Sequence, residues 1–227
     1  MANPEEYWNQ QYSASPFKKG KAPSSFLVEM HSRLRPGKLL DVGMGEGVNS
    51  VYLAQKGFSV KGFDVSSTAV EHAMALARDT GVSLEAKRVD LDLFLLGLLE
   101  YDTIVMTFFK PPQLRYYSEI IRSLKHGGTL LVESWMIEEM PEAISPEESH
   151  RDFYFRSNEL LSHLRGMRIL FYQEGEVGGK QIVQCLAQKP LDRDVAKYNL
   201  FNMQGGAKES GPTTQQQLAE ALFKKKS

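Results

Sequence analysis

Three glycines and one aspartate stand together in the stretch LLDVGMGEGVNS, residues 39–50. Gly43, Gly45 and Gly47 alternate with other residues directly after a short apolar run. Glycine allows tight turns and lets a bound ligand approach the backbone closely. Asp41 precedes Gly43 by two residues, so its carboxylate is expected beside such a ligand. The spacing predicts a ligand-binding loop.

The residue types in this loop disfavour a phosphate ligand. A P-loop requires a lysine and then serine or threonine after its second glycine, and GEGVNS contains no lysine. The dinucleotide fingerprint would place its third glycine at Val48, one residue beyond Gly47. Glu46 lies where a helix should begin, and its carboxylate would repel a pyrophosphate there. The loop favours a ligand with an ammonium group and no phosphate, as in S-adenosylmethionine.

Acidic residues also end the next two apolar segments. Asp64 follows the glycine loop by about 20 residues, where nucleotide-binding sheets place an acid that accepts both ribose hydroxyls. Asp90, in KRVDLD, is positioned to hold the adenine amino group. Val65 and Leu91, beside these acids, are positioned to sandwich the adenine ring. Acids at successive strand ends therefore predict a nucleoside site.

The apolar periodicity predicts the elements that would position these residues. Seven strands are expected, at 38–43, 58–64, 82–90, 101–108, 129–135, 167–176 and 180–189. Helices are expected at 46–57, 66–81, 111–128 and 157–166. Alternating strands and helices indicate an α/β fold with a doubly wound, mostly parallel, Rossmann-like sheet. Gly178 and Gly179 predict a closing antiparallel hairpin.

The chain is expected to divide into three parts. A helical segment over residues 1–36 would cover the site, residues 37–190 would form the cofactor-binding domain, and residues 191–227 form a polar tail. Trp8 and Tyr12 are expected to fold over the cofactor. An aromatic face near a sulfonium gains about 0.5–2 kcal/mol of cation–π energy.

Composition limits the classes of partner and compartment. The 227 residues are 42% hydrophobic and 24% charged with a net charge of −1, which disfavours a nucleic-acid partner. No apolar run approaches the roughly 18 residues of a membrane span, and the N-terminus lacks the pattern of a signal peptide. Cys185 has no partner for an internal disulfide, so a cytoplasmic protein is expected. No histidine has metal-ligand spacing with a partner, and no metal site is expected.

Residues 38–135 resemble class I S-adenosylmethionine-dependent methyltransferases. DVGMGEG matches the D/E-x-G-x-G-x-G loop of that family, GFDVS its ribose-binding strand end, and VDLD its adenine-contacting segment. GEGVNSVYLAQKGFSVKGFDVS and the opening YWNQQYS are similar to the small tellurite-resistance and thiol-methyltransferase-like branch. Met44, Val48 and His126 stand where that branch commonly has cysteine, arginine and proline.

The resemblance implies methyl transfer to a small-molecule acceptor, which could be a thiol, an amine, a hydroxyl compound or an oxyanion. Such in-line displacement requires mainly positioning, and no catalytic residue is assigned. Thr107 is included in the expected cofactor site, and Lys110, Glu133, Trp135 and the loop 136–152 are candidate acceptor contacts. An NAD(P)-dependent oxidoreductase and a non-catalytic cofactor-binding protein are the alternatives.

Overall fold

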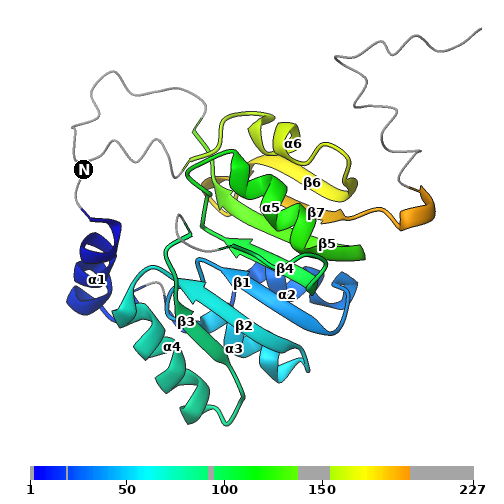
Figure 1. Ribbon diagram of the computed structural model, residues 1–227. Coiled ribbons are helices and arrows are strands. Elements are labelled where there is room, and N and C mark those ends of the chain that lie inside the picture. The colour runs from blue at the N-terminus through cyan, green and yellow to red at the C-terminus, as the bar shows by residue number, and fades with distance from the viewer. Residues whose placement is uncertain (1–2, 19, 92–94, 138–153, 195–227) are drawn as a thin grey trace, which may run out of the picture.

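A computed structural model describes residues 3–18, 20–91, 95–137 and 154–194, in which seven strands form one sheet (Figure 1). The strands are β1 (Lys38–Val42), β2 (Ser59–Asp64), β3 (Glu85–Arg88), β4 (Tyr101–Thr107), β5 (Leu124–Trp135), β6 (Arg168–Val177) and β7 (Lys180–Gln188). The α-helices are α1 (Pro4–Ala14), α2 (Ser25–Met30), α3 (Val48–Gln55), α4 (Ser67–Asp79), α5 (Arg115–Ser123) and α6 (Glu159–His163). Two short 3-10 helices are η1 (His31–Arg33) and η4 (Asp192–Asp194).

The strand order β3-β2-β1-β4-β5-β7-β6 determines where a ligand can bind. The first five strands are parallel, and β7 pairs antiparallel with both β5 and β6. The chain winds outward from β1 through β2 and β3 and then returns to β4 on the other side of β1. Such a reversal leaves a crevice at the carboxyl ends of the two strands. The predicted doubly wound sheet with a closing antiparallel hairpin is confirmed.

Two apolar layers cover the sheet, because successive strand residues point to opposite faces. Leu40 and Ile104 pack in the layer that includes residues of α5 and α6, which lie over one face (Figure 1). Leu39 and Val105, their neighbours in sequence, pack with residues of α2 and α3 in the other layer. Because both faces of the sheet are covered, the central strands have nearly continuous runs of apolar residues.

Helix α5 is shorter than predicted. It ends at Ser123 and β5 begins at Leu124, whereas the sequence pattern predicted a helix to residue 128. Nζ of Lys189 donates hydrogen bonds of 2.7–3.3 Å to three carbonyl oxygens at the end of α5, so a side chain from beyond β7 replaces a further helical turn. Among the helices in the described ranges, none has both the length and the apolar character needed to span a membrane.

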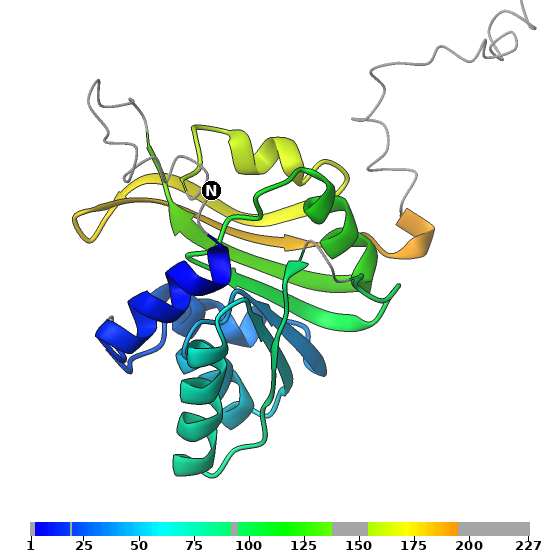
Figure 2. The same ribbon diagram turned by 60° about the vertical axis from the view of Figure 1, so that its left-hand side comes forward.

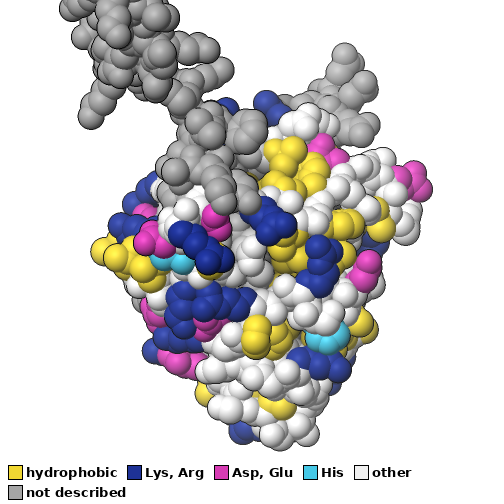
Figure 3. Space-filling model, turned by 90° about the vertical axis from the view of Figure 1, so that its right-hand side faces the viewer, with side chains coloured by type: hydrophobic (Ala, Val, Ile, Leu, Met, Phe, Trp, Pro, Cys, Tyr) yellow, Lys and Arg dark blue, Asp and Glu magenta, His cyan; other side chains and the backbone are white. Residues whose placement is uncertain are grey.

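Charged side chains pair at the amino-terminal ends of the central strands. Asp102 lies 2.7 Å from Nζ of Lys125 and 3.2 Å from Nε of Arg35, and accepts a 3.0 Å hydrogen bond from the N–H of Lys38. Burial opposes ionisation of Asp102, but these partners outweigh it and lower its pKa. The side of the molecule in Figure 3 likewise carries lysine and arginine among acidic side chains.

Candidate cofactor and acceptor site

The glycine loop connects β1 to α3 at the crevice. Gly43, Gly45 and Gly47 have φ angles of 69°, 54° and 75°, in the left-handed region that other residues disfavour. A Cβ atom on Gly43 would lie 2.6 Å from the ring of Phe109, and one on Gly45 would lie 2.9 Å from the hydroxyl of Tyr12. Both the backbone conformation and these close neighbours require glycine.

Asp41 is fully buried near the end of β1. Its Oδ2 accepts a 2.6 Å hydrogen bond from Oγ of Ser50, whereas its buried Oδ1 has no hydrogen-bond partner in the described part of the chain. Burial, with a contribution from the charge of Asp64, raises the pKa of Asp41 to about 7 despite the bond from Ser50. The unpaired buried oxygen favours a ligand that brings a cationic N–H donor to it.

Asp64, at the end of β2, holds the loop from the neighbouring strand. Its Oδ2 accepts a 2.8 Å hydrogen bond from the N–H of Gly45, and its Oδ1 accepts one of 2.9 Å from the N–H of Ser66. Burial raises the pKa of Asp64 although these backbone donors and the N–H of Val65 oppose the shift. The structure therefore brings Asp64 to the same loop as Asp41.

The N-terminal segment lies over the glycine loop and beside α4 (Figure 2). In α1, Oδ1 of Asn9 accepts a 2.7 Å hydrogen bond from Oγ of Ser66, the residue before α4. The carboxylate of Glu46 accepts 2.8 Å hydrogen bonds from the N–H of Phe17 and lies 2.8 Å from Nδ1 of His72. Glu46, which we expected to repel a pyrophosphate, anchors the N-terminal segment to the loop.

Two predicted aromatic residues belong to α1. Tyr12 places its hydroxyl against Gly45, and the ring centroid of Trp8 lies 5.9 Å from that of Tyr12. Burial, followed by the charges of Asp64 and Glu46, raises the pKa of Tyr12. Its phenol therefore stays protonated and can donate a hydrogen bond at the loop.

The residues predicted to hold the adenine lie farther along the same edge. Asp90 is exposed just beyond β3, and Leu91 is half-buried against the layer under α5. Val65 is half-buried after β2. Arg88, at the end of β3, pairs with Glu5 of α1 at 2.6 Å, so α1 is attached at this strand end too. The adenine contacts of these residues stay a prediction.

A buried polar network joins the N-terminal segment to the ends of β4 and β5. Glu133, which is 4% exposed, accepts hydrogen bonds from Oγ of Ser24 and, at 2.7 Å, from Nε2 of Gln184. The N–H of Ser24 donates to Oδ1 of Asn49 at 2.9 Å, and Nδ2 of Asn49 donates to Oγ1 of Thr107 at 2.7 Å. Only Thr107 and Glu133 in this network were predicted site residues. Ser24 is the N-cap residue of α2, and a capping serine has no local pattern that would predict a contact with Glu133.

Aromatic residues stand at the carboxyl ends of the same two strands, Phe108 directly after β4 and Trp135 as the last residue of β5. The ring centroids of Phe108 and Trp135 lie 4.8 Å apart, and Phe108 has a φ angle of 54°, a strained conformation for a residue with a side chain. Lys110, a candidate acceptor contact, instead pairs with Glu159 of α6 at 2.7 Å. Most of the candidate loop 136–152 lies outside the described residues.

The fold of this chain is similar to the folds of S-adenosylmethionine-dependent methyltransferases. One such enzyme from Methanosarcina mazei gives a TM-score of 0.57 at 25% identity, over 72% of this chain and 98% of its own. TehB from Haemophilus influenzae gives a TM-score of 0.63 at 22% identity, over 82% of this chain and 66% of its own. The fold thus defines the class of protein.

Sequence similarity identifies the family within that class. The family described as tellurite resistance protein TehB matches residues 1–183, and this chain belongs to it. Ribosomal RNA small subunit methyltransferase C of Alcanivorax borkumensis is 43% identical over 68 residues, which are 30% of this chain and 20% of that protein. The chain spans between a fifth and three fifths of the length of the first curated relatives it matches.

Proposed function

We propose that the protein methylates a small-molecule acceptor held above the carboxyl ends of β4 and β5. The supporting observation is the cover over these strand ends. The N-terminal segment is attached through Phe17 to Glu46 and through Ser24 to Glu133. A small thiol, amine, hydroxyl compound or oxyanion can fit beneath such a cover, whereas a folded RNA or protein would have to displace it.

The residues of the crevice fit S-adenosylmethionine, which when bound supplies a methyl group activated by its positive sulfur. Asp41 would hold its ammonium, because the buried Oδ1 has no other partner among the described residues. Asp64 would accept the ribose hydroxyls, since each of its oxygens retains a lone pair beyond the hydrogen bond from Gly45 or from Ser66. Tyr12 and Phe109, which pack on the glycines, would form walls of the site, and Asp90 would contact the adenine.

Glu133 is the residue best placed to orient an acceptor. Its buried carboxylate lies at the end of β5 and is bonded to Ser24, which belongs to the covering segment. An acceptor with an N–H or O–H group could replace Ser24 as the donor to this carboxylate. Glu133 would then orient the nucleophile and could receive its proton, whereas a thiolate or an oxyanion needs no base.

Methyl transfer from labelled S-adenosylmethionine tests the proposed acceptor class. The panel contains small thiols, amines and hydroxyl compounds, and tellurite and selenite as oxyanions because the family is named for tellurite resistance. Ribosomal RNA belongs in the same panel, because one relative is named as a ribosomal RNA methyltransferase. We expect turnover with at least one small acceptor. Label transferred to RNA alone would contradict the proposal.

Substitution of Glu133 by glutamine tests its orienting role. Glu133→Gln should lower kcat/KM for amine or hydroxyl acceptors by roughly 100-fold, since acid–base groups contribute on this order, and should leave the cofactor Kd unchanged. Glu100→Gln is the matched control, because Glu100 pairs with Lys38 at the opposite ends of the strands. Wild-type kcat/KM for such acceptors in Glu133→Gln would exclude this role.

A further inference from the structure

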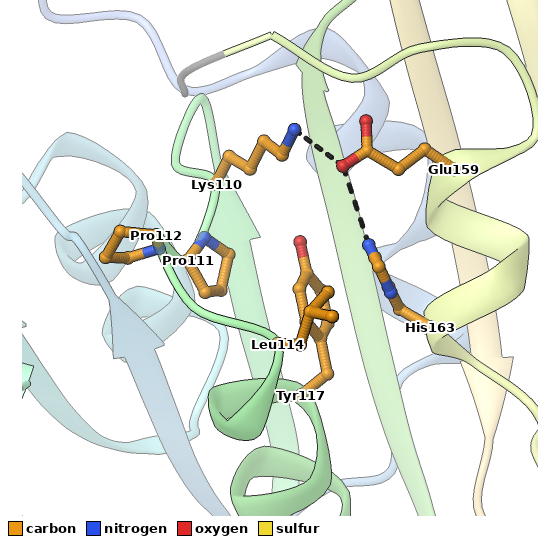
Figure 4. A pocket seen from close by; sticks show the side chains of 7 residues that line it. All are labelled: Lys110, Pro111, Pro112, Leu114, Tyr117, Glu159 and His163. Atoms are coloured by element: carbon orange, nitrogen blue, oxygen red, sulfur yellow. Dashed lines mark ion pairs between the residues drawn. The ribbon is translucent and has the colours of Figure 1, made fainter. Parts of the chain in front are cut away.

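A pocket lies between the loop that follows β4 and the helices α5 and α6 (Figure 4). Its volume is about 170 Å³, enough for a ligand of several non-hydrogen atoms rather than for a single water molecule. It is lined by Lys110, Pro111, Pro112, Leu114, Tyr117, Glu159 and His163. The polar residues among these come from three separate elements and converge on one space.

Two polar side-chain atoms at this pocket are buried and make no hydrogen bond. The hydroxyl of Tyr117 and Nε2 of His163 have no hydrogen-bond partner within the described ranges. Tyr117 is 3% exposed, and its hydroxyl points toward the space beside Lys110 and Glu159 (Figure 4). Nε2 of His163 lies 3.6 Å from Oε1 of Glu159, an ion-pair contact that is longer than a hydrogen bond (Figure 4). Because buried polar groups are nearly always hydrogen-bonded, the hydroxyl of Tyr117 indicates a missing acceptor, and His163 makes only the long contact to Glu159.

The ion pair between Lys110 and Glu159 determines the charge that a ligand in this pocket would meet. Nζ of Lys110 lies 2.7 Å from Oε1 of Glu159 and donates to the carbonyl oxygen of Tyr154 at 2.9 Å. It also lies 5.0 Å from the centroid of the Phe155 ring, so a ligand oxygen would compete with this ring for its third hydrogen. Oε2 of Glu159 accepts a 2.9 Å hydrogen bond from the N–H of Arg156. Burial opposes ionisation of Glu159, but these donors lower its pKa, so it stays charged and balances Lys110.

The groups left over are therefore mainly hydrogen-bond donors. Burial, with the nearby charge of Glu159, raises the pKa of Tyr117, so that its phenol keeps the proton. The imidazole of His163 donates from Nε2 as a cation or as the neutral tautomer protonated there. The two prolines and Leu114, which is 71% exposed, supply an apolar wall beside these donors.

We propose that this pocket binds a small aliphatic monocarboxylate. The carboxylate oxygens accept hydrogen bonds from the hydroxyl of Tyr117, from Nε2 of His163 and from the remaining ammonium hydrogen of Lys110. The short alkyl chain packs on the prolines and Leu114. An amine would find the carboxylate of Glu159 already paired with Lys110. The proposal does not depend on which acceptor is methylated.

Binding to the full chain, without cofactor or acceptor, tests the pocket. Thermal unfolding and isothermal titration are measured with sodium acetate, propionate and butyrate, and with 1-propanol, propylamine and sodium chloride at matched ionic strength. We expect propionate and butyrate to raise Tm and to bind with saturation, and 1-propanol, propylamine and chloride to do neither. If propionate changes Tm no more than chloride does and shows no saturable binding, the pocket holds only water. Tighter binding of propylamine contradicts the assigned charge. Either result overturns the proposal.

Variants locate the binding within the molecule. Tyr117→Phe should weaken propionate binding about fivefold or more, because a hydroxyl donor to a charged oxygen is lost. Tyr116→Phe is the matched control, since its hydroxyl is bonded to Arg115 and does not line the pocket. Wild-type affinity in folded Tyr117→Phe overturns the proposal. Lys110→Met should also weaken binding, and it keeps the test decisive if Tyr117→Phe does not fold.

Discussion

Replacement of Asp41 by asparagine separates the cost of burying a carboxylate from its use in binding. The folded protein raises the pKa of Asp41 from 3.8 to about 7, first through burial. Between these values the folded chain holds a proton that the unfolded chain has lost. Wild-type stability therefore falls as the pH rises through this range, by about 1.4 kcal/mol per pH unit. From pH 5 to pH 8 the loss amounts to about 2–3 kcal/mol.

The asparagine side chain cannot ionise, so the Asp41→Asn variant should lack this pH dependence. Its unfolding free energy relative to wild type should rise by about 2–3 kcal/mol between pH 5 and pH 8, measured by urea unfolding at both pH values. An unpaired amide in place of Oδ1 adds a constant loss of about 1–3 kcal/mol, which does not alter the difference. If the unfolding free energies of the two proteins changed equally with pH, the raised pKa of the buried Asp41 carboxyl would be refuted.

Asp102→Asn is the matched control for this experiment. The pKa of Asp102 is lowered, so its contribution is fully present above pH 3.8 and is lost only as the pH falls below that. The variant should be destabilised equally at pH 5 and pH 8 and should bind S-adenosylmethionine normally. Asp41→Asn should bind it roughly 10- to 150-fold more weakly, through loss of about 1.5–3 kcal/mol of a charge-assisted hydrogen bond. Unchanged affinity would place the ammonium elsewhere.

Two further substitutions test the loop and the neighbouring strand. Gly43→Ala should lower the unfolding free energy by about 1–3 kcal/mol in thermal or urea unfolding. Alanine is strained at the φ of 69° found at this position, and its Cβ would lie 2.6 Å from the ring of Phe109. Wild-type stability of this variant would contradict the observed loop conformation. Asp64→Ala should weaken cofactor binding in calorimetry by about 1–3 kcal/mol and should leave the N–H groups of Gly45 and Ser66 without their acceptor. A folded Asp64→Ala protein with wild-type affinity would show that the ribose lies elsewhere.

Local patterns predicted the sheet because each strand and helix is specified by nearby residues. Leu39 and Leu40 serve opposite apolar layers, and the glycine loop with its flanking acids is a contiguous signal. The predicted end of α5 was wrong because Lys189 supplies hydrogen bonds from 65 to 68 residues away. Periodicity within a helix contains no information about such a distant donor.

The same limit applies to the site. Ser24 and Glu133 are 109 residues apart, and the pairing of Glu46 with Phe17 spans 29 residues. Each residue alone reads as a helix cap, a strand end or a charged turn. Asn49 stands two residues after the last glycine of the loop, and only the folded chain shows that its side chain bridges Ser24 and Thr107.

The most direct test of the central claim follows the methyl group in a mixture of acceptors. The protein is incubated with tritiated S-adenosylmethionine and a cell extract, which is then divided by filtration into small molecules and macromolecules. We predict enzyme-dependent label in the small-molecule fraction as a species distinct from the cofactor, and slower labelling with Asp41→Asn at subsaturating cofactor. Label that appears only in RNA or protein would contradict a small acceptor bound beneath the N-terminal segment.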